Sequence, residues 1–66
     1  MKEYSVYVIL WDGLGKMKHV KTDYIRGLAS AREYVKNRYG VKLTYCQNAG
    51  AWVNWSKNMD VTVKEV

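Results

Sequence analysis

The chain has 66 residues, of which 48% are apolar and 26% are charged, and 11 lysines and arginines against 6 acidic residues give a net charge of +5. A chain of this length forms one domain and buries only about 60% of the surface that its unfolded form exposes. The size argues against an enzyme with a deep, water-excluding pocket, and the composition excludes a disordered chain. We therefore expect a single domain over residues 1–66 with a modest core.

Neither a membrane segment nor a disulfide or zinc framework is indicated by the sequence. The longest apolar run covers residues 6–11, whereas a membrane span needs roughly 20 apolar residues. The first residues, MKEY, do not resemble a signal peptide, so we expect a cytoplasmic protein without membrane contact. A single cysteine, Cys46, and a single histidine, His19, cannot form an internal disulfide or a structural zinc site, and we expect no metal or cofactor.

Residues 2–11 alternate as a β-strand, with Tyr4, Val6, Val8 and Leu10 on one face and Ser5, Tyr7, Ile9 and Trp11 on the other. Apolar residues on both faces favour a central position in a sheet. Residues 12–15, with two glycines, predict a turn. Residues 16–22 predict the return strand, and their lysines are typical of an edge strand that resists edge-to-edge association.

The best helix signal covers Leu28 to Tyr39, where Leu28, Ala31, Val35 and Tyr39 recur at spacings of three and four residues. Arg32 and Lys36 lie on the opposite side of this helix. Gly27 is suited to the N-cap, and Gly40 to the position just past the C-terminal end. Three turns of helix are enough to cover one face of a small sheet.

Three further strands are predicted at residues 41–47, 51–56 and 61–66, separated by turns at 48–50 and 57–60. In the middle one, Ala51, Val53 and Trp55 share one face. The order ββαβββ with one apolar helix stripe predicts a two-layer α+β domain, with the helix packed on an antiparallel sheet of four to five strands. The predicted core consists of Val6, Val8, Leu10, Leu28, Ala31, Val35, Leu43, Val53 and Val61.

A single helix leaves the second face of the sheet uncovered, and we expect that face to carry Tyr7, Ile9, Trp11 and Trp52 among Thr44, Cys46, Asn54, Thr62 and Lys64. An uncovered face is usually polar, so these rings need an explanation. They form a platform on which nucleic-acid bases stack, or a protein interface or homodimer face, or the helix and turns wrap around and half-bury them. The use of six Tyr, three Trp and no Phe favours rings on a wet surface.

The predicted second strand and its flanks concentrate basic residues, namely Lys16, Lys18, Lys21 and Arg26, with His19 among them. Alternation places Lys16 and Lys18 on one face and Lys21 on the other. These residues predict either an edge that contacts phosphates, with salt-dependent binding, or a protected edge strand. The candidate site for nucleic acid or another partner therefore comprises Lys16, Lys18, Lys21, Arg26, Tyr7, Trp11 and Trp52.

No pattern in the sequence predicts catalysis. His19 has no neighbouring carboxylate or nucleophile, Cys46 lies in a predicted strand, and the carboxylates are scattered singly. The turn DGLG lacks the spacing of a phosphate-binding loop and precedes a strand. We therefore predict a protein that is not an enzyme, without catalytic residues.

The segment LASAREYV at residues 28–35, and a turn followed by tryptophans at residues 48–55, resemble small phage-encoded anti-CRISPR inhibitors of type I-F surveillance complexes. The resemblance covers about half of the chain and carries over no functional residue. It implies a non-enzymatic inhibitor that occludes a nucleic-acid channel in a host complex. Together with the residues above, it predicts a small basic phage or mobile-element regulator that contacts nucleic acid or a nucleoprotein. The alternative is a protein-interaction or homodimerisation module that uses the open aromatic face.

Overall fold

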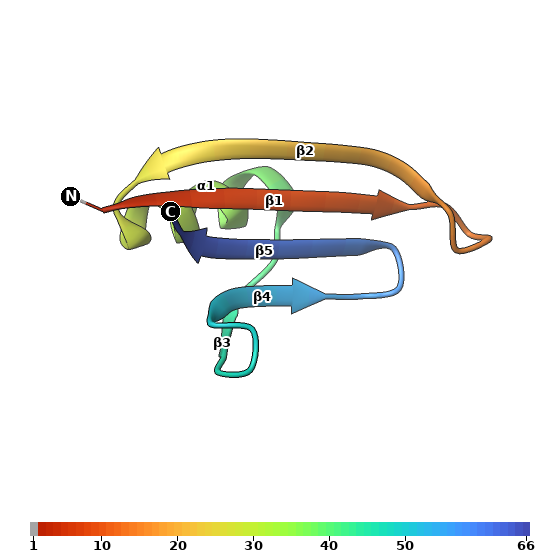
Figure 1. Ribbon diagram of the computed structural model, residues 1–66. Coiled ribbons are helices and arrows are strands. Elements are labelled where there is room, and N and C mark those ends of the chain that lie inside the picture. The colour runs from red at the N-terminus through yellow and green to blue at the C-terminus, as the bar shows by residue number, and fades with distance from the viewer. Residues whose placement is uncertain (1) are drawn as a thin grey trace.

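The computed structural model describes residues 2–66, with all of their side chains except that of His19. Five strands form one antiparallel sheet in the order β2-β1-β5-β4-β3, and the one helix of the described residues packs against a single side of that sheet (Figure 1). This arrangement confirms the predicted two-layer α+β fold. The elements are β1 (Glu3–Trp11), β2 (Met17–Arg26), α1 (Leu28–Tyr39), β3 (Thr44–Cys46), β4 (Ala51–Trp55) and β5 (Met59–Glu65).

The helix has the predicted bounds, and the strands differ from the prediction mainly in length. β2 runs on to Arg26, because it pairs with β1 until Arg26 lies opposite Glu3. β3 contains only residues 44–46, because residues 41–43 cross from the end of α1 to the edge of the sheet. The central position of β1 and the edge position of β2 are confirmed by the strand order.

The core lies between α1 and the side of the sheet that faces it. Val6 and Val8 of β1 pair with Val63 and Val61 of β5, and all four side chains are buried. They form one cluster with Ala31 and Val35 of α1 and with Leu43. Leu10 and Leu28, two members of the predicted core, are half-buried at its margin.

The predicted faces of β4 are wrong. Trp52 pairs with Val63 and Asn54 pairs with Val61, so Trp52 and Asn54 lie on the helix side of the sheet. Val53 lies on the opposite side and is half-buried, and Val63 takes its place in the core. In AWVNW the more apolar phase is Ala51, Val53 and Trp55, so alternation alone favours the wrong face, and the pairing of β4 with β5 overrides it.

A polar contact joins α1 to the edge strand β2. The Tyr34 hydroxyl donates a hydrogen bond of 2.8 Å to a carboxylate oxygen of Asp23. This hydrogen bond, together with burial, raises the pKa of Tyr34 to about 12, because ionisation of the phenol would remove the donor and place a negative charge beside the carboxylate. The contact therefore fixes the helix to β2 only while Tyr34 is neutral.

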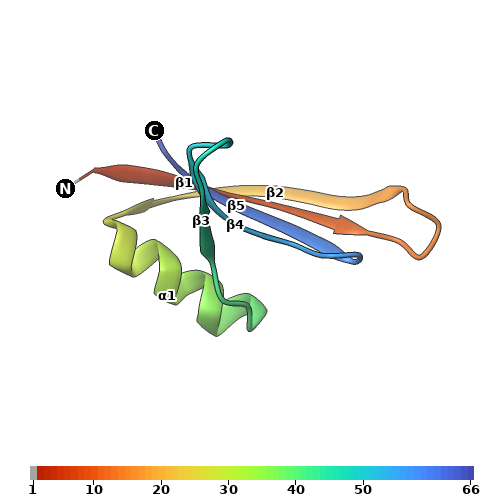
Figure 2. The same cartoon turned by 90° about the horizontal axis from the view of Figure 1, so that it is seen from below.

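The side of the sheet opposite α1 is the open face. In Figure 2, α1 lies on one side of the sheet, and the turn between β3 and β4 and the C-terminal end of the chain rise on the other. Tyr7, Tyr24 and Trp55 on the open face are 39%, 63% and 57% exposed. The helix therefore does not wrap around this face. No helix among the described residues is long and apolar enough to cross a membrane.

Candidate nucleic-acid interface

The structure separates the residues of the predicted site. Tyr7 and Arg26 lie on the open face, since Tyr7 alternates with buried Val6 and Val8, and Arg26 pairs with Glu3. Lys21 pairs with Val8 and therefore lies on the helix side, with its ammonium 3.7 Å from a carboxylate oxygen of Asp23. Lys21 and Arg26 therefore lie on opposite faces of the sheet.

The remaining predicted residues lie at the far end of the first hairpin or on the other face. Trp11 ends β1, half-buried on the open face. Lys16 lies in the turn, and Lys18 falls where the pairing of β1 and β2 shifts by one residue. Trp52 lies on the helix side and not beside Tyr7 and Trp11 as predicted. The predicted set does not form one site.

Trp52 instead forms an aromatic and basic cluster with residues from two other elements. The guanidinium carbon of Arg32 in α1 lies 4.5 Å from the centre of the Trp52 ring. Tyr45 pairs with Trp52 across β3 and β4, with ring centres 5.4 Å apart and planes at 65°. The distance places Arg32 in cation–π contact with Trp52. Tyr45 remains 51% exposed, so part of its ring is free to meet a ligand.

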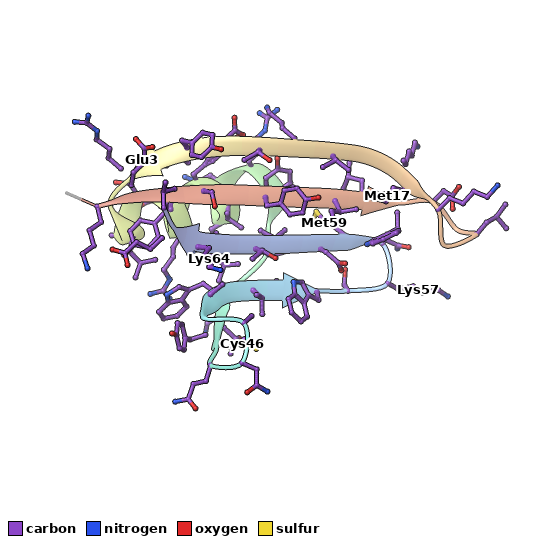
Figure 3. The ribbon with its side chains drawn as sticks, in the orientation of Figure 1. Glu3, Met17, Cys46, Lys57, Met59 and Lys64 are labelled. Carbon is purple, nitrogen blue, oxygen red and sulfur yellow. The ribbon has the colours of Figure 1, made fainter. Side chains whose placement is uncertain are left out.

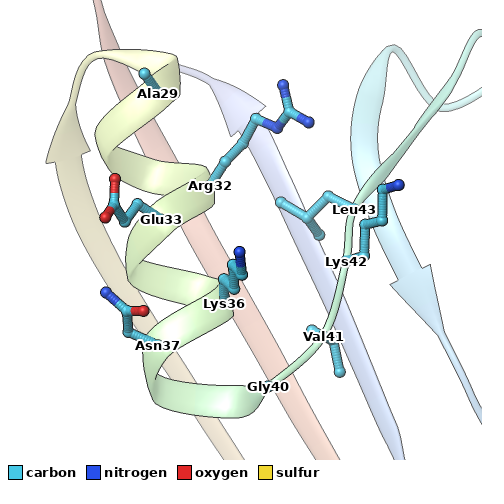
Figure 4. Close-up of a pocket in the computed structure, with 9 residues that line it drawn as sticks. All are labelled: Ala29, Arg32, Glu33, Lys36, Asn37, Gly40, Val41, Lys42 and Leu43. Carbon is cyan, nitrogen blue, oxygen red and sulfur yellow. The ribbon is translucent and has the colours of Figure 1, made fainter.

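Arg32 also lines a groove of about 620 Å³ between α1 and residues 40–43 (Figure 4). Lys36 lies one turn after Arg32 on the same side of the helix, and Lys42 lines the groove from the crossing segment. Glu33 is the one acidic residue that lines the groove, and Figure 4 draws it on the side of the helix away from residues 41–43.

Local structure fixes the two walls of this groove. Gly40 takes the left-handed conformation, with φ 69° and ψ 24°, and its N–H donates to the carbonyl of Lys36 at 2.9 Å, which ends α1 and reverses the chain. Leu43 is buried in the core and anchors the far end of the crossing segment. The Asn54 side chain donates a 2.8 Å hydrogen bond to the carbonyl of Lys42. These contacts fix the backbone of the crossing segment beside α1.

The cations of the groove are not neutralised by ion pairs. Within residues 2–66, apart from the undescribed His19 side chain, the ion pairs are Lys2–Glu65 at 3.0 Å and Lys21–Asp23 at 3.7 Å. Arg32, Lys36 and Lys42 take part in neither. Exposed cations that lack a carboxylate partner remain available to an anionic ligand.

Sequence reasoning did not bring Arg32, Lys36, Lys42 and Tyr45 together. It placed Arg32 and Lys36 only on the side of the helix opposite its apolar stripe. Their spacing of four residues was visible in the sequence, but the chain reversal at Gly40, which brings Lys42 back toward them, was not.

Comparison with models of known protein families, with curated proteins and with solved structures finds no match for this chain. No relative therefore bears on its function, and the resemblance to anti-CRISPR inhibitors stays a prediction. Among the described residues, no group of three or more His, Cys, Asp or Glu side chains is arranged to hold a metal ion. The basic groove and the adjoining rings are the features from which a function is inferred.

Proposed function

We propose that this protein is a small non-enzymatic module that binds single-stranded nucleic acid along the groove beside α1. The ligand backbone lies against Arg32, Lys36 and Lys42, and a base stacks on the exposed ring of Tyr45. Nucleic-acid grooves of this kind combine basic side chains that follow the phosphates with aromatic rings that stack on bases. If the resemblance to anti-CRISPR inhibitors reflects ancestry, this nucleic acid belongs to a host nucleoprotein complex.

The observation that supports the proposal most is the stack of Arg32 on Trp52 beside Tyr45. Trp52 restricts the otherwise flexible guanidinium, so less entropy is lost when Arg32 meets a phosphate. A net charge of +5 adds long-range attraction for a polyanion. The groove is open to solvent, which suits a strand lying along it.

Binding by a few phosphate contacts predicts a defined salt dependence. Three contacts to a single strand give a slope of about −2 for the logarithm of affinity against the logarithm of salt concentration. Raising salt from about 50 to about 200 mM should then weaken binding about 20-fold. Fluorescence anisotropy with labelled single-stranded oligothymidylate and oligouridylate measures this slope and separates DNA from RNA as the ligand.

Neutralising substitutions test the location of the site. Arg32→Gln, Lys36→Gln and Lys42→Gln should each lower the affinity and reduce the magnitude of the salt slope by about 0.7. Lys57→Gln is the matched control. Lys57 lies exposed in the turn between β4 and β5, and this substitution removes the same single positive charge as each groove variant. If Lys57→Gln lowered the affinity as much as the groove variants do, binding would depend on net charge alone, and the proposed site would be contradicted.

The stacking contact is tested separately. Tyr45→Ala should weaken binding by about 1 kcal/mol or more, since stacking of one base on an aromatic ring contributes about 1–3 kcal/mol. Tyr24→Ala on the open face is the control, because Tyr24 is also exposed but lies on the opposite side of the sheet. A larger loss for Tyr24→Ala would move the binding surface to the open face.

A further inference from the structure

The open face has a regular arrangement of apolar and charged side chains across four strands. Residues paired directly across neighbouring strands share a face. The rows that cross β4, β5, β1 and β2 are Trp55–Asp60–Ile9–Val20 and Val53–Thr62–Tyr7–Thr22, and the next row across β5, β1 and β2 is Lys64–Ser5–Tyr24. Figure 3 looks onto this face, with Lys64 labelled on β5.

Several side chains of these rows are exposed although they carry little polarity. Val20 is 44% exposed, and Tyr24 and Trp55 are more exposed still. An open sheet face in water is normally polar, and a contiguous apolar surface usually marks an interaction site. The open face therefore favours a partner that covers it as a second layer.

Two opposite charges on the central strand of this face lie symmetrically about its middle, and the pair Glu3 and Arg26 lies beyond them at one end of β1 and β2. Asp60 and Lys64 lie on β5, two residues before and two residues after Thr62. β5 is the third of the five strands, so Thr62 marks the middle of the sheet. Among the described side chains, neither Asp60 nor Lys64 forms an ion pair with another residue.

We propose that a second copy of this chain packs on the open face, with a two-fold axis that crosses the strands at Thr62. A two-fold axis in this direction reverses the strands of the second sheet, so Asp60 of each copy faces Lys64 of the other. Such an interface joins the same patch on both copies, and its two ion pairs are equivalent by symmetry. A two-fold axis that runs along β5 would instead place Asp60 opposite Asp60 and Lys64 opposite Lys64, and these like charges would repel.

The geometry of packed sheets allows this pairing. Asp60 and Lys64 each lie ~7 Å along the strand from Thr62, at about 3.3 Å per residue. Two aligned sheets pack ~10 Å apart and cross at about 30°, which shifts facing residues at this distance sideways by ~3 Å. The lysine side chain is long enough to span that shift. On the axis, Tyr7 of one copy faces Tyr7 of the other. In the rows of the ion pairs, Val20 of one copy faces Tyr24 of the other, so apolar side chains lie beside the ion pairs.

The size of the face agrees with a dimer. Interfaces of standard size bury about 800 Å² on each partner. The protein has an accessible surface of 4811 Å², so such an interface takes about one sixth of it. α1 and the basic groove lie on the outer sides of the dimer, because they are on the other side of the sheet (Figure 2). The dimer therefore does not depend on the proposed nucleic-acid site.

Charge reversal with sedimentation equilibrium tests the proposed symmetry. The wild-type protein should form a dimer at micromolar to high-micromolar concentration in about 150 mM salt, where surface charges beyond ~8 Å are screened. Asp60→Lys places lysines opposite lysines, and Lys64→Asp places aspartates opposite aspartates. Each single variant should raise the dissociation constant at least 10-fold, and the double variant Asp60→Lys/Lys64→Asp should return it to within about 3-fold of wild type.

Lys57→Asp is the matched control for Lys64→Asp, because Lys57 lies in the turn beyond the sheet face and the variant changes the net charge equally (Figure 3). It should leave the dissociation constant within about 3-fold of wild type. Circular dichroism confirms that each variant is folded. A wild-type protein that stays monomeric at several hundred micromolar, or a double variant no better than the single ones, would overturn the proposal. Nucleic-acid affinity of the folded double variant, whose net charge is unchanged, separates failure of the dimer from failure of the groove.

Discussion

The two faces of the sheet are built from the same strands with the same alternation, yet they differ in what covers them. On the helix side, Val6, Val8, Val61 and Val63 are at most 2% exposed, because α1 lies over them. On the open face, Tyr7 is 39% exposed and Tyr24 is 63% exposed. The contrast teaches that stability comes from the covered face, whereas the open face is available for a partner. Substitutions on the helix side should therefore mainly change stability, whereas substitutions on the open face should mainly change association with a partner.

The largest expected effect is the loss of a buried valine. Val61→Ala should lower the free energy of unfolding by about 2 kcal/mol, because two methyl groups leave the core at about 0.8 kcal/mol each and a cavity remains. Val66→Ala makes the same change at a side chain that is 70% exposed and should stay within about 0.5 kcal/mol of wild type. Urea unfolding at one fixed protein concentration compares the two. Similar losses for both variants would show that the helix side does not form the stabilising core.

An intermediate effect is expected from the hydrogen bond between α1 and β2. Tyr34→Phe removes the donor to Asp23 and should lower the stability by about 1 kcal/mol. Because the pKa of Tyr34 is raised to about 12 in the folded protein, from about 10 when unfolded, its stabilisation is complete below pH 10 and is lost as the pH rises toward 12. The stability difference between wild type and Tyr34→Phe should therefore shrink over that range. A difference that grows with pH would contradict the assigned hydrogen bond.

The smallest effect is expected at the far end of the first hairpin, beyond the reach of α1. One carboxylate oxygen of Asp12 accepts hydrogen bonds from the amides of Lys16 and Leu14, at 2.9 and 2.8 Å, and these amides lower the pKa of Asp12. Asp12→Ala should speed amide exchange at Leu14 and Lys16 and leave the amide of Val61 unchanged. Asp12→Asn keeps an acceptor oxygen and should show a weaker effect. Faster exchange at Val61 would mean that the turn and the core unfold together.

The contribution of Asp12 also has a defined dependence on acid. Since its pKa is lower in the folded protein than in the unfolded chain, the turn is stabilised above the unfolded value near 3.8. That stabilisation is lost as the pH falls through the lower, folded value. Comparing the acid unfolding of wild type with that of Asp12→Asn measures it.

Much of the fold was predictable because local signals agreed with one another. Leu28 to Tyr39 forms the predicted helix, with Gly27 and Gly40 at its ends and a single apolar stripe between them. Strand β1 was predicted to be central from its apolar residues on both faces, and β2 to be an edge from its lysines. The candidate site was predicted far less well. Among its predicted residues only Trp52 belongs to the cluster beside the groove, and it does so on the face opposite to the predicted one.

The sequence by itself determined the one-helix α+β architecture, because one apolar helix stripe can cover only one side of a sheet. The tertiary structure decided which ring meets which cation. The alternation of AWVNW favours Ala51, Val53 and Trp55 as the core face, and pairing with Val63 rather than hydrophobicity turned Trp52 toward Arg32. The groove arose because Gly40 reverses the chain and buried Leu43 pins residues 41–43 beside α1. Contacts between residues far apart in the chain depend on register and chain reversal, and neither is encoded by a local pattern.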